Sequence, residues 1–197
     1  AQPARNVDTA LEAADWTGFE ARKAEAATRG KIAGISAVYY FERTGGGPEE
    51  SAIIDVKPDG TITTAVGTQS TGQGHETVWP QIIHEELGVD PDKVQLLAGD
   101  SDLLEKAGGT GGSRSLIMAS RVLMKAAEDV VEKAMEGASN LLEAAKADIE
   151  YTVEDGGQFR IKGTDRSVTL FEAVGELGGV VGNGEVADRT ATFPNGC

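Results

Sequence analysis

The chain has 197 residues, a hydrophobic fraction of 40% and a formal net charge of −14 at pH 7. This length can bury one sizeable core, and the composition is typical of a globular protein. The acidic excess, with no basic run, argues against a nucleic-acid-binding surface. No apolar stretch approaches the roughly 20 residues of a membrane span.

The ends of the chain and its single cysteine bear on location. Cys197 has no second cysteine to pair with, which fits a reducing compartment. The polar first residues lack the apolar core of a signal peptide, so we expect a cytoplasmic protein and leave a periplasmic one open. The chain lacks an initiator methionine and stops without a terminal helix, so we expect a piece of a longer polypeptide.

The N-terminal part of the sequence predicts a helix and then strands. An apolar stripe over residues 8–29 favours helix, and Gly30 follows it. Residues 32–42 are rich in β-branched and aromatic side chains and favour a strand. Residues 53–56 and 61–66 flank Pro-Asp-Gly at 58–60, which predicts a hairpin.

The first glycine-rich segment, residues 67–77 (GTQSTGQGHET), leads into a predicted helix. Trp79, Ile82, Ile83 and Leu87 lie on one face of that helix. Thr77 is the expected N-cap, Pro80 falls in the first turn, and Gly88 ends the helix. A short strand is expected at residues 94–97.

The second glycine-rich segment, residues 108–115 (GGTGGSRS), leads into a longer predicted helix. Ser113 or Ser115 can cap this helix, and Gly137 is expected to close it. A short helix over 139–147 and a hairpin over 149–161 follow. Thr169 and Glu172 match a capping box for a last helix.

These elements predict an α+β fold in two layers, with helices packed on a mixed β-sheet. We expect an N-terminal helical segment at 1–31 and the main α+β domain at 32–178. Residues 179–197 are glycine-rich and are expected to be an irregular segment that leads to further chain.

The two glycine-rich segments are the candidate binding site. A helix start presents unpaired N–H groups and partial positive charge, and glycines let the backbone approach a phosphate closely. Arg114 suits bidentate phosphate contacts, which favours anion binding at the second segment. At the first segment, ligand binding and a simple tight turn stand about even.

The remaining polar residues predict no catalytic or metal site. His84 is expected to be a packed or surface histidine, and Asp100 and Asp102 to cap their loop. No cluster has metal-ligand spacing, and no nucleophile–base arrangement can be made with local support.

Several segments together resemble one known family. The chain is similar to the molybdenum-binding large subunit of the xanthine dehydrogenase/aldehyde oxidase/carbon monoxide dehydrogenase family. The likeness covers most of the chain, in order, and rests on residues 15–19 (DWTGF), 24–34, 72–77 (GQGHET), 86–89 (ELGV), 99–100 (GD) and 109–115 (GTGGSRS).

The resemblance implies a molybdenum cofactor-binding domain whose two loops hold molybdopterin, in bacterial members commonly the cytosine dinucleotide. The parent enzyme would oxidise or hydroxylate an aldehyde, heterocycle or similar small substrate, with iron–sulfur and flavin partner subunits or domains as electron acceptors. The implied cofactor contacts are Gln73, Gly74, His75, Gly111, Gly112, Ser113, Arg114 and Ser115.

The family's catalytic glutamate lies in a Gly-x-Gly-Glu segment well downstream. Residues 182–185 (GNGE) have those letters but come too early, in an expected connecting loop, so we do not assign the base to Glu185. No catalytic residue is expected in this chain, which alone would be inactive. The cofactor is expected in the parent enzyme and not in this chain on its own. Ser120 departs from the family, where a glycine is expected.

Two alternatives remain open at this point. One is a non-catalytic module that binds an ordinary nucleotide through its glycine loops, and the other is a subunit-interaction domain with an acidic surface.

Overall fold

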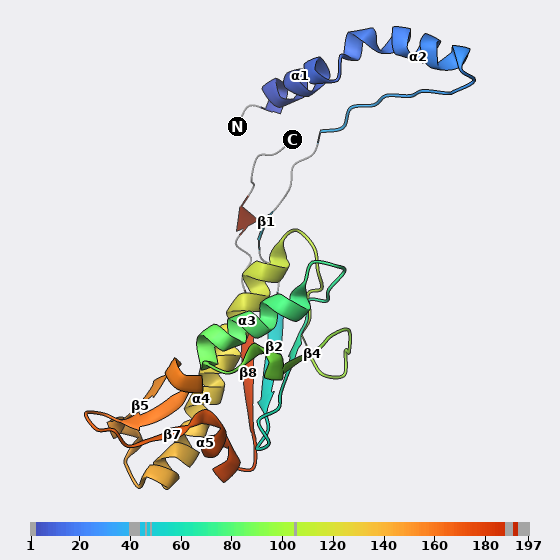
Figure 1. The fold of residues 1–197 in the computed structure, drawn as a ribbon. Coiled ribbons are helices and arrows are strands. Elements are labelled where there is room, and N and C mark those ends of the chain that lie inside the picture. The colour runs from blue at the N-terminus through green and yellow to red at the C-terminus, as the bar shows by residue number, and fades with distance from the viewer. Residues whose placement is uncertain are drawn as a thin grey trace. The chain divides into compact units, whose positions relative to one another are not determined.

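A computed structural model describes residues 3–39, 44–45, 47, 49–104, 106–187 and 191–192 of the chain (Figure 1). These residues belong to two compact units, Ala1–Thr44 with Thr192–Cys197 and Gly45–Ala191, and each unit is described separately. Within the described residues, no helix is both long and apolar enough to cross a membrane.

The helical stretch of the first unit is interrupted, whereas the sequence predicts one helix over 8–29. Helix α1 (Pro3–Ala13) and helix α2 (Phe19–Thr28) are separated by the 3₁₀ turn η1 (Trp16–Gly18). Asp15 adopts a left-handed conformation (φ 46°) and accepts a hydrogen bond from the Gly18 N–H, which caps the turn. The strand expected at 32–42 is absent from residues 31–39, and residues 40–42 lie outside the described part.

A mixed sheet forms the second unit's first layer. Its strand order is β4 (Val94–Leu97), β3 (Ile62–Val66), β2 (Glu50–Val56) and β8 (Val180–Val186). Strand β2 is antiparallel to β3 and to β8, whereas β3 and β4 are parallel. The predicted hairpin is therefore confirmed.

Strand β8 corrects the sequence prediction for residues 179–197, because residues 180–186 are regular rather than irregular. Two short strands, β1 (Thr44–Gly45) and β9 (Ala191–Thr192), pair with each other.

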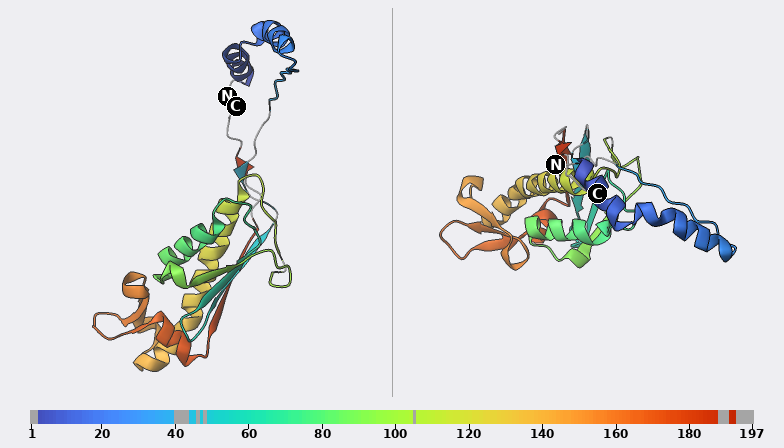
Figure 2. Two further views of the ribbon diagram at one scale, coloured as in Figure 1. Left: turned by 45° about the vertical axis from the view of Figure 1, so that its right-hand side comes forward. Right: turned by 90° about the horizontal axis from the view of Figure 1, so that it is seen from above.

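Helices α3 (His75–Leu87) and α4 (Ser120–Leu142) form the second layer, and a π-helical stretch, η3 (Ser115–Ala119), leads into α4. Figures 1 and 2 show both helices on one face of the sheet. The core between the layers is apolar and includes Ile54, Ile62, Trp79, Ile83, Val122, Ala126 and Val130. The α+β prediction of helices on a mixed sheet is confirmed.

Helices of the second unit differ from the sequence prediction in the start of α3, in the end of α4 and in the short helix expected over 139–147, whose residues 139–142 belong to α4. Helix α3 begins at His75 with Gly74 as its N-cap, so Thr77 is not the cap and Pro80 lies in the second turn. Helix α4 runs through Gly137 to Leu142. A Cβ on Gly137 would lie 2.1 Å from the carbonyl oxygen of Ala173, so this glycine permits close helix packing instead of ending the helix.

A smaller sheet covers the far end of α4. Strands β5 (Ile149–Thr152), β6 (Gln158–Ile161) and β7 (Ser167–Thr169) form an antiparallel ladder, and helix α5 (Leu170–Glu176) follows β7. The Thr169–Glu172 capping box is confirmed. Short 3₁₀ turns lie at η2 (Pro91–Lys93), η4 (Lys146–Asp148) and η5 (Glu154–Gly156).

Side chains of α4 satisfy backbone groups of β8, which lies at an edge of the larger sheet. Lys133 Nζ donates to the Val181 carbonyl oxygen at 2.8 Å, and the Asn183 N–H donates to Asp129 Oδ2 at 2.8 Å. Lys125 Nζ donates to the Glu185 carbonyl oxygen at 3.1 Å. Exposed edge strands are templates for aggregation, so these contacts protect the edge as well as holding the strand to the helix.

Replacing Asp129 with alanine is expected to destabilise the protein by about 1–3 kcal/mol at pH 7, because a charge-assisted hydrogen bond to the strand is lost. Burial acts to raise the pKa of Asp129, but hydrogen bonds from Lys133 and Asn183 lower it overall. This stabilisation is therefore present above the usual aspartate pKa and is lost as the pH falls through the lowered pKa.

Urea unfolding at neutral and acid pH measures this difference between the wild type and D129A. Glu128, an exposed neighbour on the same helix, supplies the matched control E128A. A change within about 0.5 kcal/mol is expected for the control. Equal effects of D129A at pH 7 and at pH 2 would contradict the assignment.

Candidate functional site

The two glycine-rich segments meet because β3 and β4 run parallel. The carboxyl ends of parallel strands lie at the same edge of a sheet. The first segment follows β3 and leads to α3, and the second follows β4 and leads to η3 and α4. Thr110 Oγ1 in the second segment donates to the Gln69 carbonyl oxygen in the first at 2.6 Å, so the two are directly linked.

A groove of about 450 Å³ lies between the two segments. One side consists of residues from the first segment and from α3, and the other of residues from the second segment and η3. The lining residues are Gln73, His75, Val78, Trp79, Thr110, Gly111, Gly112, Ser113, Ser115 and Leu116. None of these described residues is Lys or Arg, so among them the positive potential in the groove comes from backbone groups.

Both sides of the groove carry runs of available N–H groups. Within the described part of the chain, the backbone N–H groups of residues 72–76 and 109–113 donate to no protein acceptor. Residues 72–76 span the N-terminus of α3, and residues 109–113 precede the start of η3. Consecutive free N–H groups at helix starts attract anions, and the helix dipoles add to this attraction.

The first segment presents a buried imidazole and an amide to the groove. His75 is 4% exposed, and its ring centroid lies 4.6 Å from that of Trp79. Burial lowers the pKa of His75, so the ring is neutral at pH 7 and carries one N–H donor. The Gln73 side-chain oxygen accepts from Thr71, which leaves the amide NH₂ group available as a donor.

The second segment is held in an unusual conformation. Ser113 has a φ of 56°, a value that non-glycine residues rarely adopt, and Gly112 has a φ of 53°. The π-helical turn η3 then replaces the predicted Ser113 or Ser115 side-chain cap, which the structure does not form. Both features cluster at functional sites in proteins.

The structure brings together six of the eight predicted site residues as groove lining: Gln73, His75, Gly111, Gly112, Ser113 and Ser115. Gly74 is the left-handed N-cap of α3, with a φ of 77°. The Arg114 side chain is turned into the protein, where it pairs with Glu50. The Arg114 backbone N–H donates to the Gly111 carbonyl oxygen at 3.0 Å, so a contact between Arg114 and a phosphate stays a prediction.

Sequence reasoning did not single out Glu50, Thr110 or the groove roles of Trp79 and Leu116. Trp79 and Leu116 fit the apolar helix stripes, so nothing separated them from core positions. Thr110, between two pairs of glycines, was the clearest available signal. For Glu50, the only signal was a charged residue at the start of an apolar strand.

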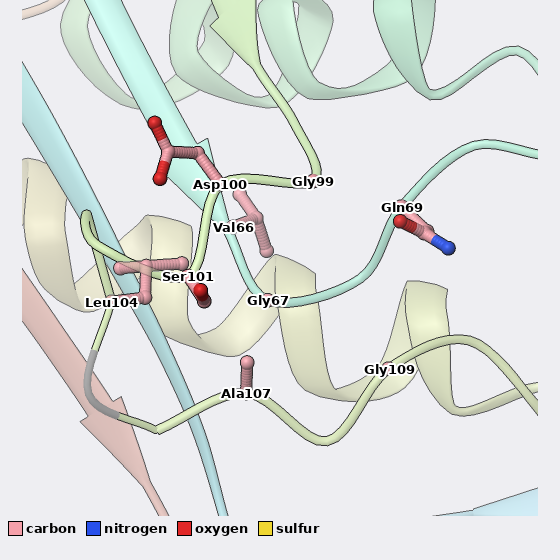
Figure 3. Close-up of a pocket in the computed structure, with 9 residues that line it drawn as sticks. All are labelled: Val66, Gly67, Gln69, Gly99, Asp100, Ser101, Leu104, Ala107 and Gly109. Atoms are coloured by element: carbon pink, nitrogen blue, oxygen red, sulfur yellow. The ribbon is translucent and has the colours of Figure 1, made fainter.

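A second hollow of about 270 Å³ lies beside the first, between the end of β3 and residues 99–109 (Figure 3). In Figure 3 the Ala107 methyl group points towards Gly67, while the Asp100 carboxylate is turned away from it. Asp100 Oδ1 accepts from the Asp102 N–H at 2.9 Å, so the loop-capping prediction for Asp100 is confirmed.

The other residues weighed in the sequence have local partners. His84 Nδ1 bonds to the Val89 carbonyl oxygen at 2.8 Å, as expected for a packed histidine. Residues 182–185 lie in β8 and not in a connecting loop, and Glu185 pairs with Lys106 at 3.0 Å. Across the described ranges, no three His, Cys, Asp or Glu side chains gather into a metal-binding group.

Comparison with known proteins gives consistent matches. Residues 9–195 match the family described as molybdopterin cofactor-binding domain. The chain is 34% identical over 168 residues to the 6-hydroxypseudooxynicotine dehydrogenase complex subunit gamma of Paenarthrobacter nicotinovorans, covering 85% of this chain and 21% of that protein. It is 36% identical over 155 residues to the carbon monoxide dehydrogenase large chain of Afipia carboxidovorans, covering 72% and 19%.

The fold is also similar to a solved structure. Reconstituted CO dehydrogenase from Oligotropha carboxidovorans matches with a TM-score of 0.70 and 29% sequence identity, over 94% of this chain and 26% of that chain. The chain spans about a fifth of the length of the 6-hydroxypseudooxynicotine dehydrogenase complex subunit gamma, 21%.

Proposed function

The chain belongs to the molybdopterin cofactor-binding domain family of molybdenum oxidoreductases, and we propose that it holds the cofactor as a cytosine dinucleotide in the groove between its two glycine-rich segments. The observation that carries the proposal is the pair of free N–H runs, residues 72–76 and 109–113, that belong to the two sides of one groove.

The groove fits a ligand with a pyrophosphate and a flat polar ring system. The N–H runs supply donors for phosphate oxygens in a groove whose lining, as far as the structure describes it, contains no Lys or Arg. Gln73, Ser113 and Ser115 add side-chain donors and acceptors, and Val78, Trp79 and Leu116 provide apolar surface for a ring. A neutral His75 can donate to the ligand without introducing a charge.

In this proposal the cofactor and the chain have different roles. Bound molybdenum cofactor supplies the redox chemistry, while this chain binds and orients it. We propose that the whole protein oxidises or hydroxylates a small substrate and passes electrons to iron–sulfur and flavin partners. The names of the relatives, which include a complex subunit and a large chain, support a multi-subunit arrangement.

The proposal is tested by making the protein in a host that synthesises molybdopterin dinucleotides. Purified protein should contain molybdenum and pterin in equal amounts, and acid hydrolysis should release CMP. Protein that carries neither molybdenum nor pterin would sink the proposal, and release of GMP instead of CMP would refute the cytosine form alone.

A general nucleotide-binding module is the second candidate, because free N–H groups recognise phosphates and not bases. Calorimetric titration of the chain with CDP, GDP and ADP separates the two. We expect CDP to bind more tightly than GDP or ADP. Equal affinities for all three would favour the general module.

A further inference from the structure

Glu50 is a fully buried carboxylate at the edge where the two glycine-rich segments begin. It is the first residue of β2 and is 0% exposed. Because β2 is antiparallel to β3, its start lies beside the end of β3, where the first segment leaves the sheet. The second segment passes the same point, so one side chain can reach both.

One oxygen of Glu50 holds the second segment. Oε2 accepts from Arg114 Nη1 at 2.5 Å and from the Gly108 N–H at 3.3 Å. The Arg114 guanidinium also donates to the Gly109 carbonyl oxygen at 2.6 Å and to the Glu49 carbonyl oxygen at 3.1 Å. The pair therefore ties residues 108–114 to the start of β2 through several hydrogen bonds.

The other oxygen lies against the beginning of the first segment. A Cβ on Gly67 would lie 2.0 Å from Glu50 Oε1 and 2.7 Å from the Ala107 Cα. A Cβ on Gly108 would lie 2.3 Å from Arg114 Nη2. The backbones of both segments are thus packed directly onto the ion pair.

Stability alone does not account for the burial of this ion pair. Within the part of the chain that the structure describes, Glu50 Oε1 and Arg114 Nε are buried without a hydrogen-bond partner. Buried ion pairs are often no more stabilising than apolar side chains of the same volume, because removing both charges from water is costly. What the pair adds is a set of directional hydrogen bonds to Gly108, Gly109 and Glu49.

We propose that Glu50, acting through Arg114, is a positioning residue that sets the spacing of the two glycine-rich segments and so shapes the groove for its phosphate-bearing ligand. The identity of the ligand in this inference rests on the proposed function. The positioning of the two segments by Glu50 does not. It also explains why Arg114 lies inside the protein while the neighbouring Ser113 and Ser115 line the groove.

The test compares the wild-type chain with E50M, R114M and the double variant E50M/R114M. Each single variant leaves one buried charge unpaired and is expected to lower the melting temperature or prevent folding. The double variant removes both charges and should regain most of the thermal stability. E185Q is the control, because Glu185 forms an exposed ion pair with Lys106, which lies just before the second glycine-rich segment.

Two measurements distinguish a role of the ion pair in positioning the segments from a role in thermal stability. In the double variant, the ¹⁵N order parameters of residues 108–113 should fall from about 0.85 to below about 0.6, while those of α4 stay unchanged. Affinity for CDP, measured by calorimetry, should fall about 10- to 100-fold, by analogy with the loss of residues that orient metal ligands. E185Q should match the wild type in both.

A double variant with rigid segments and wild-type CDP affinity would overturn the proposal, because it would show that the pair serves stability only. Failure of the wild type to bind CDP would contradict the proposed function. The order parameters would still test the positioning role of Glu50. In that case, mobile glycine-rich segments in the double variant support the positioning role of Glu50, and rigid segments refute it.

Discussion

Replacing Gly184 with alanine is expected to destabilise the protein by about 3 kcal/mol, the upper end of the usual cost of overpacking. A Cβ at this position would lie 1.9 Å from the Val122 carbonyl oxygen and 2.9 Å from the Ala126 N–H nitrogen. Both atoms belong to the backbone of α4 and cannot move aside as a side chain can. The helix and β8 would have to separate.

Gly175 provides the matched control for this prediction. It lies in α5, is exposed, and a Cβ there would meet nothing within 4 Å. G175A should therefore stabilise the protein by about 0.5–1 kcal/mol, because alanine loses less backbone entropy in a helix. Urea unfolding of both variants gives the comparison, and equal stabilities would show that β8 does not pack on α4 as described.

The second large effect is expected on binding. Gly111 lines the groove, has no positive φ, and a Cβ there would meet nothing within 4 Å. G111L should therefore leave the fold intact while its side chain occupies part of the groove in which we propose that the cofactor binds. A steric cost of about 1–3 kcal/mol corresponds to a loss of roughly 10- to 100-fold in affinity.

Molybdenum and pterin content, with CDP affinity as a second measure, test this prediction. The control is G34L, since Gly34 is equally open, has no positive φ and is not among the groove's lining residues. Unchanged cofactor content in G111L, with a normal melting temperature, would place the ligand elsewhere. A reduced content in G34L as well would point to a general effect on folding.

Local patterns were enough to predict much of this chain. The hairpin over 53–66, the strand at 94–97 and the Thr169–Glu172 capping box all depend on residues close in sequence, and all are present. The two glycine-rich segments lead into helices as expected, whereas the anion binding that their residue types indicate stays a prediction.

Glycine was misread where its role is to allow close packing. Gly137 suggested a helix end, and Gly182 and Gly184 suggested an irregular segment, because glycine disfavours regular structure in isolation. In the structure, a Cβ on any of these three would collide with the backbone of a neighbouring element. Periodicity along one segment carries no information about how closely another approaches it.

Arg114 shows the same division at the site. Its position at a helix start in an acidic chain led to the prediction of anion binding at the second segment, but the direction of its side chain depended on Glu50, 64 residues away. The residue types and spacing of the chain thus define its family, many of its local elements and the two glycine-rich segments proposed to bind the ligand, since these follow from neighbouring residues. Tertiary structure decides the groove, the order of strands and the partner of Arg114, because parallel pairing of β3 with β4 and antiparallel pairing with β2 join residues that no local pattern connects.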